Sequence, residues 1–165
     1  MDIIKTAIHA SLPDHWQSLV HLRRTGAVDW WRLCQVECAC FGWERMLFGL
    51  WPKVFDHKAT VWIVEIGSLL AGYVIAYPRL LDGSNVMYVG GIGTLPTLRR
   101  YGLATRLMQQ VLAGTAWLHV RAGNEPAIRL YERLNMRVLH RLPRFYTNGE
   151  DALVFVTPDL FAGAS

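Results

Sequence analysis

The chain has 165 residues, 52% of them hydrophobic and 18% charged, and its formal net charge is +4. This composition excludes an intrinsically disordered chain, and the length suits one domain with a single core. The positive charge favours an anionic partner, but without a stripe of Arg and Lys it does not favour direct binding to nucleic acid. Apolar runs stay short of the ~20 residues of a membrane span and the first residues lack a signal-peptide pattern, so we expect a soluble, cytoplasmic protein that does not bind membranes.

The N-terminal part divides into an extension and the start of the domain. Residues 1–14 show no hydrophobic periodicity, so we expect an N-terminal extension there and a single domain over 15–165. The first elements predicted within that domain are a strand over 18–24 and amphipathic helices over 28–41 and 44–55.

Three cysteines, Cys34, Cys38 and Cys40, fall inside the first of these helices. No second Cys/His pair follows at zinc-binding spacing, and an odd number of thiols in an apolar segment is typical of packing residues. We therefore expect reduced thiols, with neither a metal site nor a disulfide.

The rest of the chain alternates strands with helices, which places it in the α/β class. β-Branched runs on both sides of Gly67-Ser68 predict a hairpin. A strand, an amphipathic helix and a second strand then follow, and this order favours a parallel crossover. We expect strands over 60–66, 69–80, 87–95, 115–121, 137–146 and 152–157, and helices over 99–113 and 124–134.

The run from Pro96 to Ala104 predicts a phosphate-binding turn. It leaves a glycine-rich strand, where Gly90, Gly91 and Gly93 indicate a bulge or the close approach of another backbone or a ligand. It then opens a helix, whose free backbone N–H groups and positive dipole end attract a pyrophosphate. On its own an Arg-x-x-Gly-x-Ala turn is a weak signal, because any turn before a helix can carry it.

The second run, Leu118 to Asn124, and the helix after it carry a histidine and a tyrosine that suit proton transfer. Strand alternation puts His119 on the face opposite Leu118, and an imidazole with a pKa of ~6.5 can accept a proton from an ammonium group, directly or through a water. The phenol of Tyr131, with a pKa of ~10, stays protonated at neutral pH and can donate. From the residues alone, a half-buried strand histidine and a tyrosine packed on an amphipathic helix are open alternatives.

Taken together and in this order, the two runs resemble the acetyl-CoA motifs of the GNAT N-acetyltransferase superfamily. The resemblance covers roughly residues 18–158. The later stretch, with Arg144-Phe145-Tyr146 and Glu150-Asp151-Ala152, is similar to the branch that acetylates protein N-termini, typified by the ribosomal-protein alanine N-acetyltransferases. The motifs themselves are Arg99-x-x-Gly102-x-Ala104 and Leu118-His119-Val120-Arg121-x-x-Asn124-x-x-Ala127-Ile128-x-Leu130-Tyr131.

This resemblance implies a mixed central sheet of about six to seven strands, flanked by about four helices and splayed between its fourth and fifth strands. It implies transfer of acetyl from acetyl-CoA to a primary amine by direct attack in a ternary complex, without a metal. The acceptor expected first is a protein N-terminal α-amine, with a ribosomal protein as a candidate substrate and the enzyme a monomer or homodimer. The alternatives are a small amine, a lysine side chain, or a non-catalytic acyl-CoA-binding module.

The resemblance also implies roles for individual residues. His119 would be the general base and Tyr131 the general acid, while the backbone of Ile92 and Thr94 would hold the pantetheine and polarise the thioester carbonyl. The cofactor-binding positions implied in full are Ile92, Gly93, Thr94, Arg99, Arg100, Tyr101, Gly102, Leu103, Ala104 and Asn124.

Two further positions, Glu37 and Tyr146, are implied to contact the acceptor. From the sequence alone, Glu37 also fits a solvent-facing place on its helix, and Asn124 also fits a helix cap. The chain departs from the ribosomal pattern at His119, where Glu is usual, although other members that act on protein N-termini carry His there. Thr94 replaces the more common Val.

Overall fold

The computed structural model describes residues 15–42, 58–81 and 84–162. The predictions of an extension over 1–14 and of a helix over 44–55 lie outside these residues. The strands are β1 (Val20–Arg24), β2 (Thr60–Ile66), β3 (Leu69–Leu81), β4 (Ser84–Thr94), β5 (Ala116–Arg121), β6 (Arg137–Leu142) and β7 (Ala152–Val156). The helices are α2 (Trp30–Phe41), α5 (Leu103–Val111), α6 (Glu125–Arg133) and α7 (Pro158–Ala162), with 3-10 turns η1 (Trp16–Leu19), η2 (Ala27–Asp29) and η4 (Pro96–Leu98).

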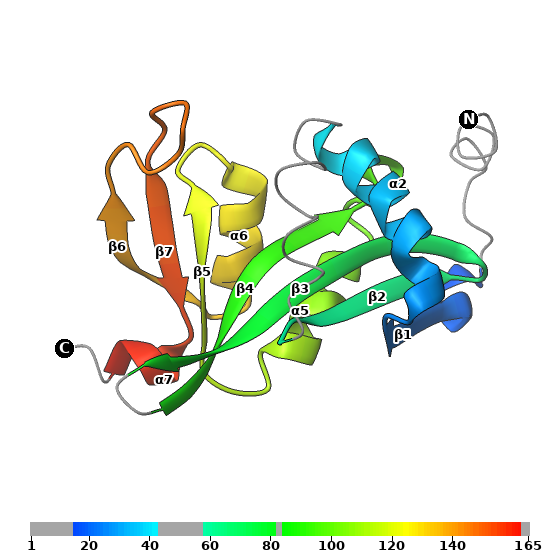
Figure 1. Ribbon diagram of the computed structural model, residues 1–165, viewed down its shortest axis with the longest axis horizontal. Helices are drawn as coiled ribbons and strands as arrows, with labels where there is room; N and C mark the ends of the chain where they lie inside the picture. Colours follow the sequence, from blue (N-terminus) through cyan, green and yellow to red (C-terminus); the bar gives the residue numbers. More distant parts are fainter. Residues whose placement is uncertain (1–14, 43–57, 82–83, 163–165) are drawn as a thin grey trace.

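The seven strands form one sheet in the order β1-β2-β3-β4-β5-β7-β6. Neighbours are antiparallel except for β4 and β5, which run parallel and pair only over residues 87–89 and 116–118. Beyond these residues the two strands diverge (Figure 1). The mixed sheet with a splay between its fourth and fifth strands is therefore confirmed. No helix in the described part of the chain is long and apolar enough to cross a membrane.

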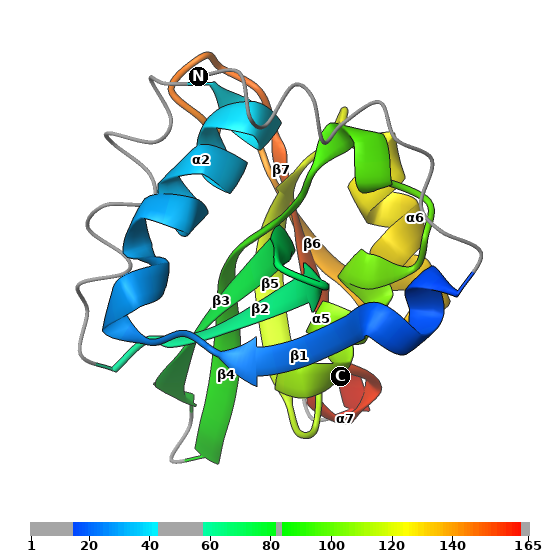
Figure 2. The ribbon, with the colours of Figure 1, turned by 90° about the vertical axis from the view of Figure 1, so that its right-hand side faces the viewer.

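The helices cover both faces of the sheet. α2 lies on one face, and α5 and α6 lie on the other (Figure 2). The central strand β3 is buried from both sides, with Tyr73 directed toward α2 and its neighbour Val74 toward the opposite face. On α5, Leu103, Leu107 and Val111 recur at helical spacing and are buried, and each buried leucine contributes about 2 kcal/mol of hydrophobic stabilisation.

A β-bulge in β4 coincides with the divergence from β5. The register with β3 passes from Ala76 opposite Val89 to Ile75 opposite Gly91, so Gly90 is the extra residue. A side chain at Gly90 would have to displace the ring of Tyr77, because its Cβ would lie 2.5 Å from that ring. The bulge predicted from the glycine-rich strand is therefore present, directly after the last residue that pairs with β5.

A network of four charges fastens the start of α2 to β1 and β2. Arg23 pairs with Asp29 at 2.6 Å and with Glu65 at 2.9 Å, and Arg32 pairs with the same two carboxylates at 3.3 and 2.7 Å. Asp29 is fully buried, and its hydrogen bonds with Arg23 lower its pKa to about 2. The network fixes the helix that carries Glu37.

The helix expected from residue 99 begins instead at Leu103. Arg100 (φ 70°) and Gly102 (φ 75°) adopt the left-handed conformation, which interrupts a right-handed helix. Residues 99–102 therefore form an exposed turn ahead of α5.

The strand expected over 137–146 ends at Leu142. A left-handed residue, Arg144 (φ 51°), follows closely, and its backbone N–H donates to Asp151 Oδ1 at 2.8 Å. Residues 143–151 therefore form a loop, called the β6–β7 loop below, which includes Tyr146.

Candidate active site

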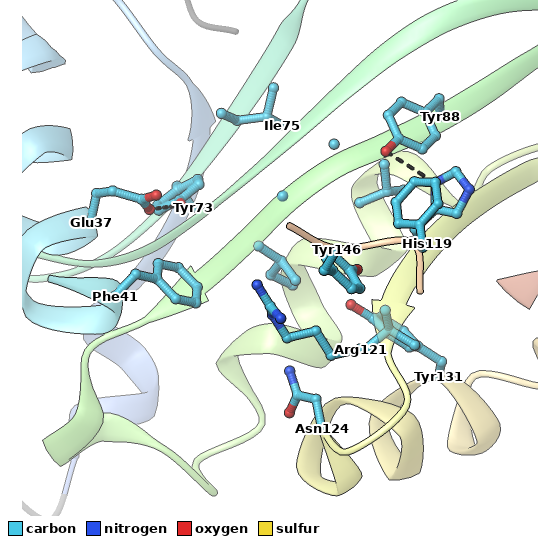
Figure 3. Close-up of a pocket in the computed structure, with 16 residues that line it drawn as sticks. Glu37, Phe41, Tyr73, Ile75, Tyr88, His119, Arg121, Asn124, Tyr131 and Tyr146 are labelled. Carbon is cyan, nitrogen blue, oxygen red and sulfur yellow. Dashed lines mark hydrogen bonds between the residues drawn. The ribbon is translucent and has the colours of Figure 1, made fainter. Parts of the chain in front are cut away.

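A pocket of about 290 Å³ occupies the opening between β4 and β5 (Figure 3). Side chains or backbone from α2, β3, β4, β5, α6 and the β6–β7 loop line it. Among the residues predicted for the site, it brings together Glu37, Ile92, His119, Asn124, Tyr131 and Tyr146. Those outside its lining are Gly93, Thr94, Arg99, Arg100, Tyr101, Gly102, Leu103 and Ala104, which lie at the end of β4 and along the turn into α5.

His119 projects into this pocket from β5. Burial alternates along the strand, with Leu118 and Val120 in the core and His119 half-buried on the other face. The Nδ1 atom of His119 lies 3.4 Å from the hydroxyl of Tyr88 on β4, and Phe145 stacks on the imidazole with ring centroids 4.6 Å apart. Burial lowers the pKa of His119, which keeps the ring neutral at physiological pH.

Tyr131, on α6, lines the same pocket as His119. It is 5% exposed, and its ring packs against Phe155 of β7 with centroids 5.5 Å apart. Its hydroxyl is directed toward Tyr146 (Figure 3). Burial, followed by the proximity of Tyr146, raises the pKa of Tyr131, so the phenol holds its proton across the physiological range.

Glu37 closes the opposite side of the pocket. It lies one turn after Leu33 on the inner face of α2 and is only 5% exposed, so the solvent-facing alternative is wrong. Its carboxylate accepts a hydrogen bond from the hydroxyl of Tyr73 on β3. The exposed ring of Phe41 borders the same end of the pocket (Figure 3).

The turn before α5 presents backbone N–H groups. The first helical bond runs from Arg106 N to Gly102 O at 3.1 Å, so the N–H groups of Leu103, Ala104 and Thr105 precede the hydrogen-bond ladder of the helix. The side chain of Leu103 is 1% exposed and fills the core, which leaves only its backbone for a ligand. An exposed glycine at φ 75° followed by free N–H groups fits a phosphate.

Asn124 has a structural role as well as a place in the pocket. Its side-chain oxygen accepts a hydrogen bond from Ala127 N at 3.4 Å and so caps α6. The helix-cap interpretation of Asn124 is therefore confirmed, and its contact with a cofactor stays a prediction.

The cysteines of α2 are free thiols in the structure. Cys40 contacts β4, where its Sγ donates to the backbone oxygen of Thr94 at 3.1 Å. Burial raises the pKa of this thiol to about 12, so it stays protonated and unreactive. Among the described residues, no group of His, Cys, Asp and Glu is arranged to hold a metal ion.

Among the pocket residues that sequence reasoning did not assign to the site are Tyr73, Tyr88, Arg121 and Phe145. Tyr88 meets His119 only because β4 and β5 pair in parallel with Tyr88 opposite Trp117. Phe145 meets His119 through the β6–β7 loop. Sequence spacing predicts neither the contact of Tyr88 with His119 nor that of Phe145 with His119. Phe145 is, however, the neighbour of the predicted Tyr146.

Comparison with known proteins identifies the class. The profile described as "Acetyltransferase (GNAT) family" matches residues 23–136, and the chain belongs to this family. The N-alpha-acetyltransferase of Saccharolobus solfataricus is 37% identical over 121 residues, which cover 62% of this chain and 71% of that protein. The N-alpha-acetyltransferase of Sulfurisphaera tokodaii is 30% identical with the same coverage.

Solved structures agree with this assignment. Arabidopsis thaliana NAA60 bound to a bisubstrate analogue superposes with a TM-score of 0.72 at 28% identity, over 84% of this chain and 98% of that one. The ribosomal-protein-S18-alanine N-acetyltransferase of Escherichia coli shares the fold, with a TM-score of 0.70 at 22% identity over 84% and 93% of the two chains. The protein is an N-acetyltransferase that uses acetyl-CoA as its acyl donor.

Proposed function

We propose that this N-acetyltransferase modifies the α-amino group of protein N-termini, with a ribosomal protein as a candidate substrate. The observation that carries the proposal is the pocket itself, where a neutral imidazole and a protonated phenol lie opposite a wall that bears Glu37. The relatives named N-alpha-acetyltransferase support the choice of amine. The ribosomal substrate is supported by the resemblance of the late motifs to the ribosomal-protein branch.

His119 is the proposed base. An N-terminal ammonium must lose a proton before its nitrogen can attack a carbonyl carbon. The neutral imidazole accepts that proton, directly or through a water, while the hydroxyl of Tyr88 beside Nδ1 orients the ring.

Tyr131 is the proposed acid. As the amine nitrogen forms its bond to the acetyl carbon, the bond from that carbon to sulfur breaks and the sulfur gains a proton. The raised pKa of Tyr131 keeps the phenol protonated until that moment, so it is available as the donor.

The donor side of the proposed site runs along β4 to the turn before α5. When bound, acetyl-CoA supplies the acetyl thioester. A Cβ at Gly91 would meet no atom within 4 Å, so the strand leaves open space beside the pantetheine-binding stretch from Ile92 to Thr94. Arg99 and Arg100 add positive charge to the N–H groups at the start of α5, which suits a pyrophosphate.

The acceptor side lies between α2 and the β6–β7 loop. Glu37, held by Tyr73, and Tyr146, from the loop, border the pocket from opposite sides (Figure 3). We propose that these two side chains contact the first residues of a peptide.

Thiol release from acetyl-CoA against a panel of acceptors tests the proposal. The panel holds short peptides with free N-termini and varied first residues, the same peptides blocked at the N-terminus but carrying a lysine, and small diamines. We expect release with free N-termini only. Release with the blocked lysine peptides or the diamines alone would overturn the assignment of the acceptor, and tight acetyl-CoA binding without release on any acceptor would favour a binding module.

A further inference from the structure

The β6–β7 loop is attached to β5 at two neighbouring points, both at the pocket. His119 and Arg121 are alternate residues of β5, so their side chains leave the same face of the strand. Phe145 stacks on the imidazole of His119 with the ring planes 19° apart. The guanidinium carbon of Arg121 lies 4.1 Å from the ring centroid of Tyr146. The two consecutive aromatic residues of the loop are thus each paired with one side chain of β5.

Arg121 also bonds the far side of the loop. Its Nη1 donates to Glu150 Oε2 at 2.8 Å and to Asn148 Oδ1 at 3.1 Å. The second oxygen of Glu150 accepts from the backbone N–H of Gly123 at 3.2 Å. The hydrogen bond from Arg121 is the main cause of a lowered pKa for Glu150, which stays ionised at physiological pH. One guanidinium therefore spans the loop from Tyr146 to Glu150.

We propose that Arg121 is a positioning residue for the reaction, which holds the β6–β7 loop against β5 so that Phe145 covers His119 and Tyr146 stays beside Tyr131. This inference rests on the proposed function only in treating His119 as the base. The nine-residue loop carries an exposed Phe145 and a half-buried Tyr146, and ordering it costs conformational entropy. The bonds to Arg121, together with the backbone bond from Tyr146 N to Glu150 O at 3.0 Å, select the conformation that closes over the imidazole.

The loop influences the pKa of His119 through burial of the imidazole, as the groups that surround this ring indicate. Phenols from β4, α6 and the loop (Tyr88, Tyr131 and Tyr146) share the pocket. Burial raises the pKa values of Tyr88 and Tyr131, so these two stay uncharged through the pH range in which an imidazole titrates. Glu37 borders the pocket from α2, on the side away from His119 (Figure 3). Release of the loop would expose the imidazole to water and raise its pKa toward the ordinary value of about 6.5.

Two variants break the anchor from opposite sides and separate release of the loop from a simple charge effect. Arg121→Gln removes a cation near His119, and loss of the charge alone would raise the pKa of the imidazole. Glu150→Gln removes an anion, and loss of the charge alone would lower it. Release of the loop predicts an upward shift in both variants. Arg129→Gln is the matched control. Arg129 makes an ion pair with Glu125 on the exposed surface of α6, and its length of 2.8 Å equals that of the pair between Arg121 and Glu150.

The first readout is the pKa of His119, from an NMR titration of the histidine rings with His119→Gln used for assignment. This measurement needs no turnover, so it stands even if the enzyme acetylates no N-terminal peptide. We expect the pKa of His119 to rise in Arg121→Gln and in Glu150→Gln and to stay at the wild-type value in Arg129→Gln. An unchanged pKa in both anchor variants, or shifts of opposite sign, would overturn the proposal.

The second readout is the pH dependence of kcat/KM on the acceptor that the panel identifies. Release of the loop should move the acid limb of the profile to higher pH and raise the acceptor KM by about three- to tenfold, with the acetyl-CoA KM unchanged. A merely structural role would lower kcat equally at every pH. Circular dichroism verifies folding, and if Arg121→Gln does not fold, Arg121→Lys replaces it, since it keeps the charge but loses the planar fork that spans the loop.

Discussion

Tyr131 gives the sharpest test of the proposed chemistry, because one oxygen atom carries its role. In Tyr131→Phe the ring keeps its packing against Phe155, so the fold should be preserved. Loss of the proton donor should lower kcat by about 10²-fold, while the acetyl-CoA KM changes less than about twofold. Steady-state kinetics on the best peptide, with acetyl-CoA binding measured by calorimetry as the control, decides the matter. A kcat within threefold of the wild-type value would exclude Tyr131 as the acid, because loss of a packing contact alone can change kcat by that much.

The residues of the site divide into those that sequence spacing predicts and those that it does not. His119 and Tyr131 belong to one strand–helix unit, so their approach follows from local geometry. Tyr88 and Phe145 reach His119 through a strand register and a loop conformation, both of which depend on tertiary packing. Glu37 shows the same limit, because only the packing of α2 on β3 reveals that it is buried.

Strand β4 offers a test of the bulge. A Cβ in Gly90→Ala would lie 2.5 Å from the ring of Tyr77, which is buried and stacked on Tyr88 at a centroid distance of 6.3 Å. The ring has to move, so we expect a loss of about 1–3 kcal/mol in unfolding free energy. Because Tyr88 contacts His119, kcat should fall as well.

Gly91→Ala is the control for this variant. A Cβ at Gly91 would meet no atom within 4 Å, so its unfolding free energy should stay within about 0.5 kcal/mol of wild type. Urea unfolding of both variants provides the comparison. Equal losses in the two would mean that the contact with Tyr77 does not set the cost, because strand propensity alone favours alanine over glycine.

Hydrophobic periodicity predicts which helices and strands exist better than it predicts the residues at which they begin and end. The apolar repeat of α5 is readable from Leu103 to Val111, and the alternation of β5 is equally clear. The predicted ends fail at residues 99–102 and 143–146, because left-handed residues, Arg100 and Arg144 among them, break the elements there. A non-glycine residue with positive φ leaves no mark in a hydrophobic pattern. Both failures fall on loops that border the proposed site, and irregular backbone is common at functional sites.

Across the molecule, the sheet separates the proposed donor side from the proposed acceptor side. α5 and its preceding turn lie on one face of the sheet, and α2 with Glu37 lies on the other (Figure 2). The ion network of Asp29 fastens only the acceptor side, through β1 and β2. A substitution that breaks the network should therefore change the KM of the acceptor more than the KM of acetyl-CoA.

Asp29→Asn tests this separation together with its pH dependence. The buried carboxylate has a pKa of about 2 in the folded protein, against ~3.9 when unfolded. A lowered folded-state pKa means that the carboxylate stabilises the fold above pH ~4 by about 2–3 kcal/mol, and that this stabilisation is lost as the pH falls toward 2. Urea unfolding at pH 7 should show a loss of at least that size in Asp29→Asn, because two arginines are left facing one carboxylate.

The gap between wild type and Asp29→Asn should narrow as the pH falls from 4 toward 2, since protonation removes the same charge from the wild type. At pH 7 the peptide KM should rise in the variant while the acetyl-CoA KM stays constant, because the network holds α2 and not the turn before α5. Glu125→Gln, which breaks an exposed pair on α6, should leave both quantities unchanged. Equal increases in the two KM values would show that the acceptor and donor sides respond as one unit, and the separation of the site into two independently fastened halves would be wrong.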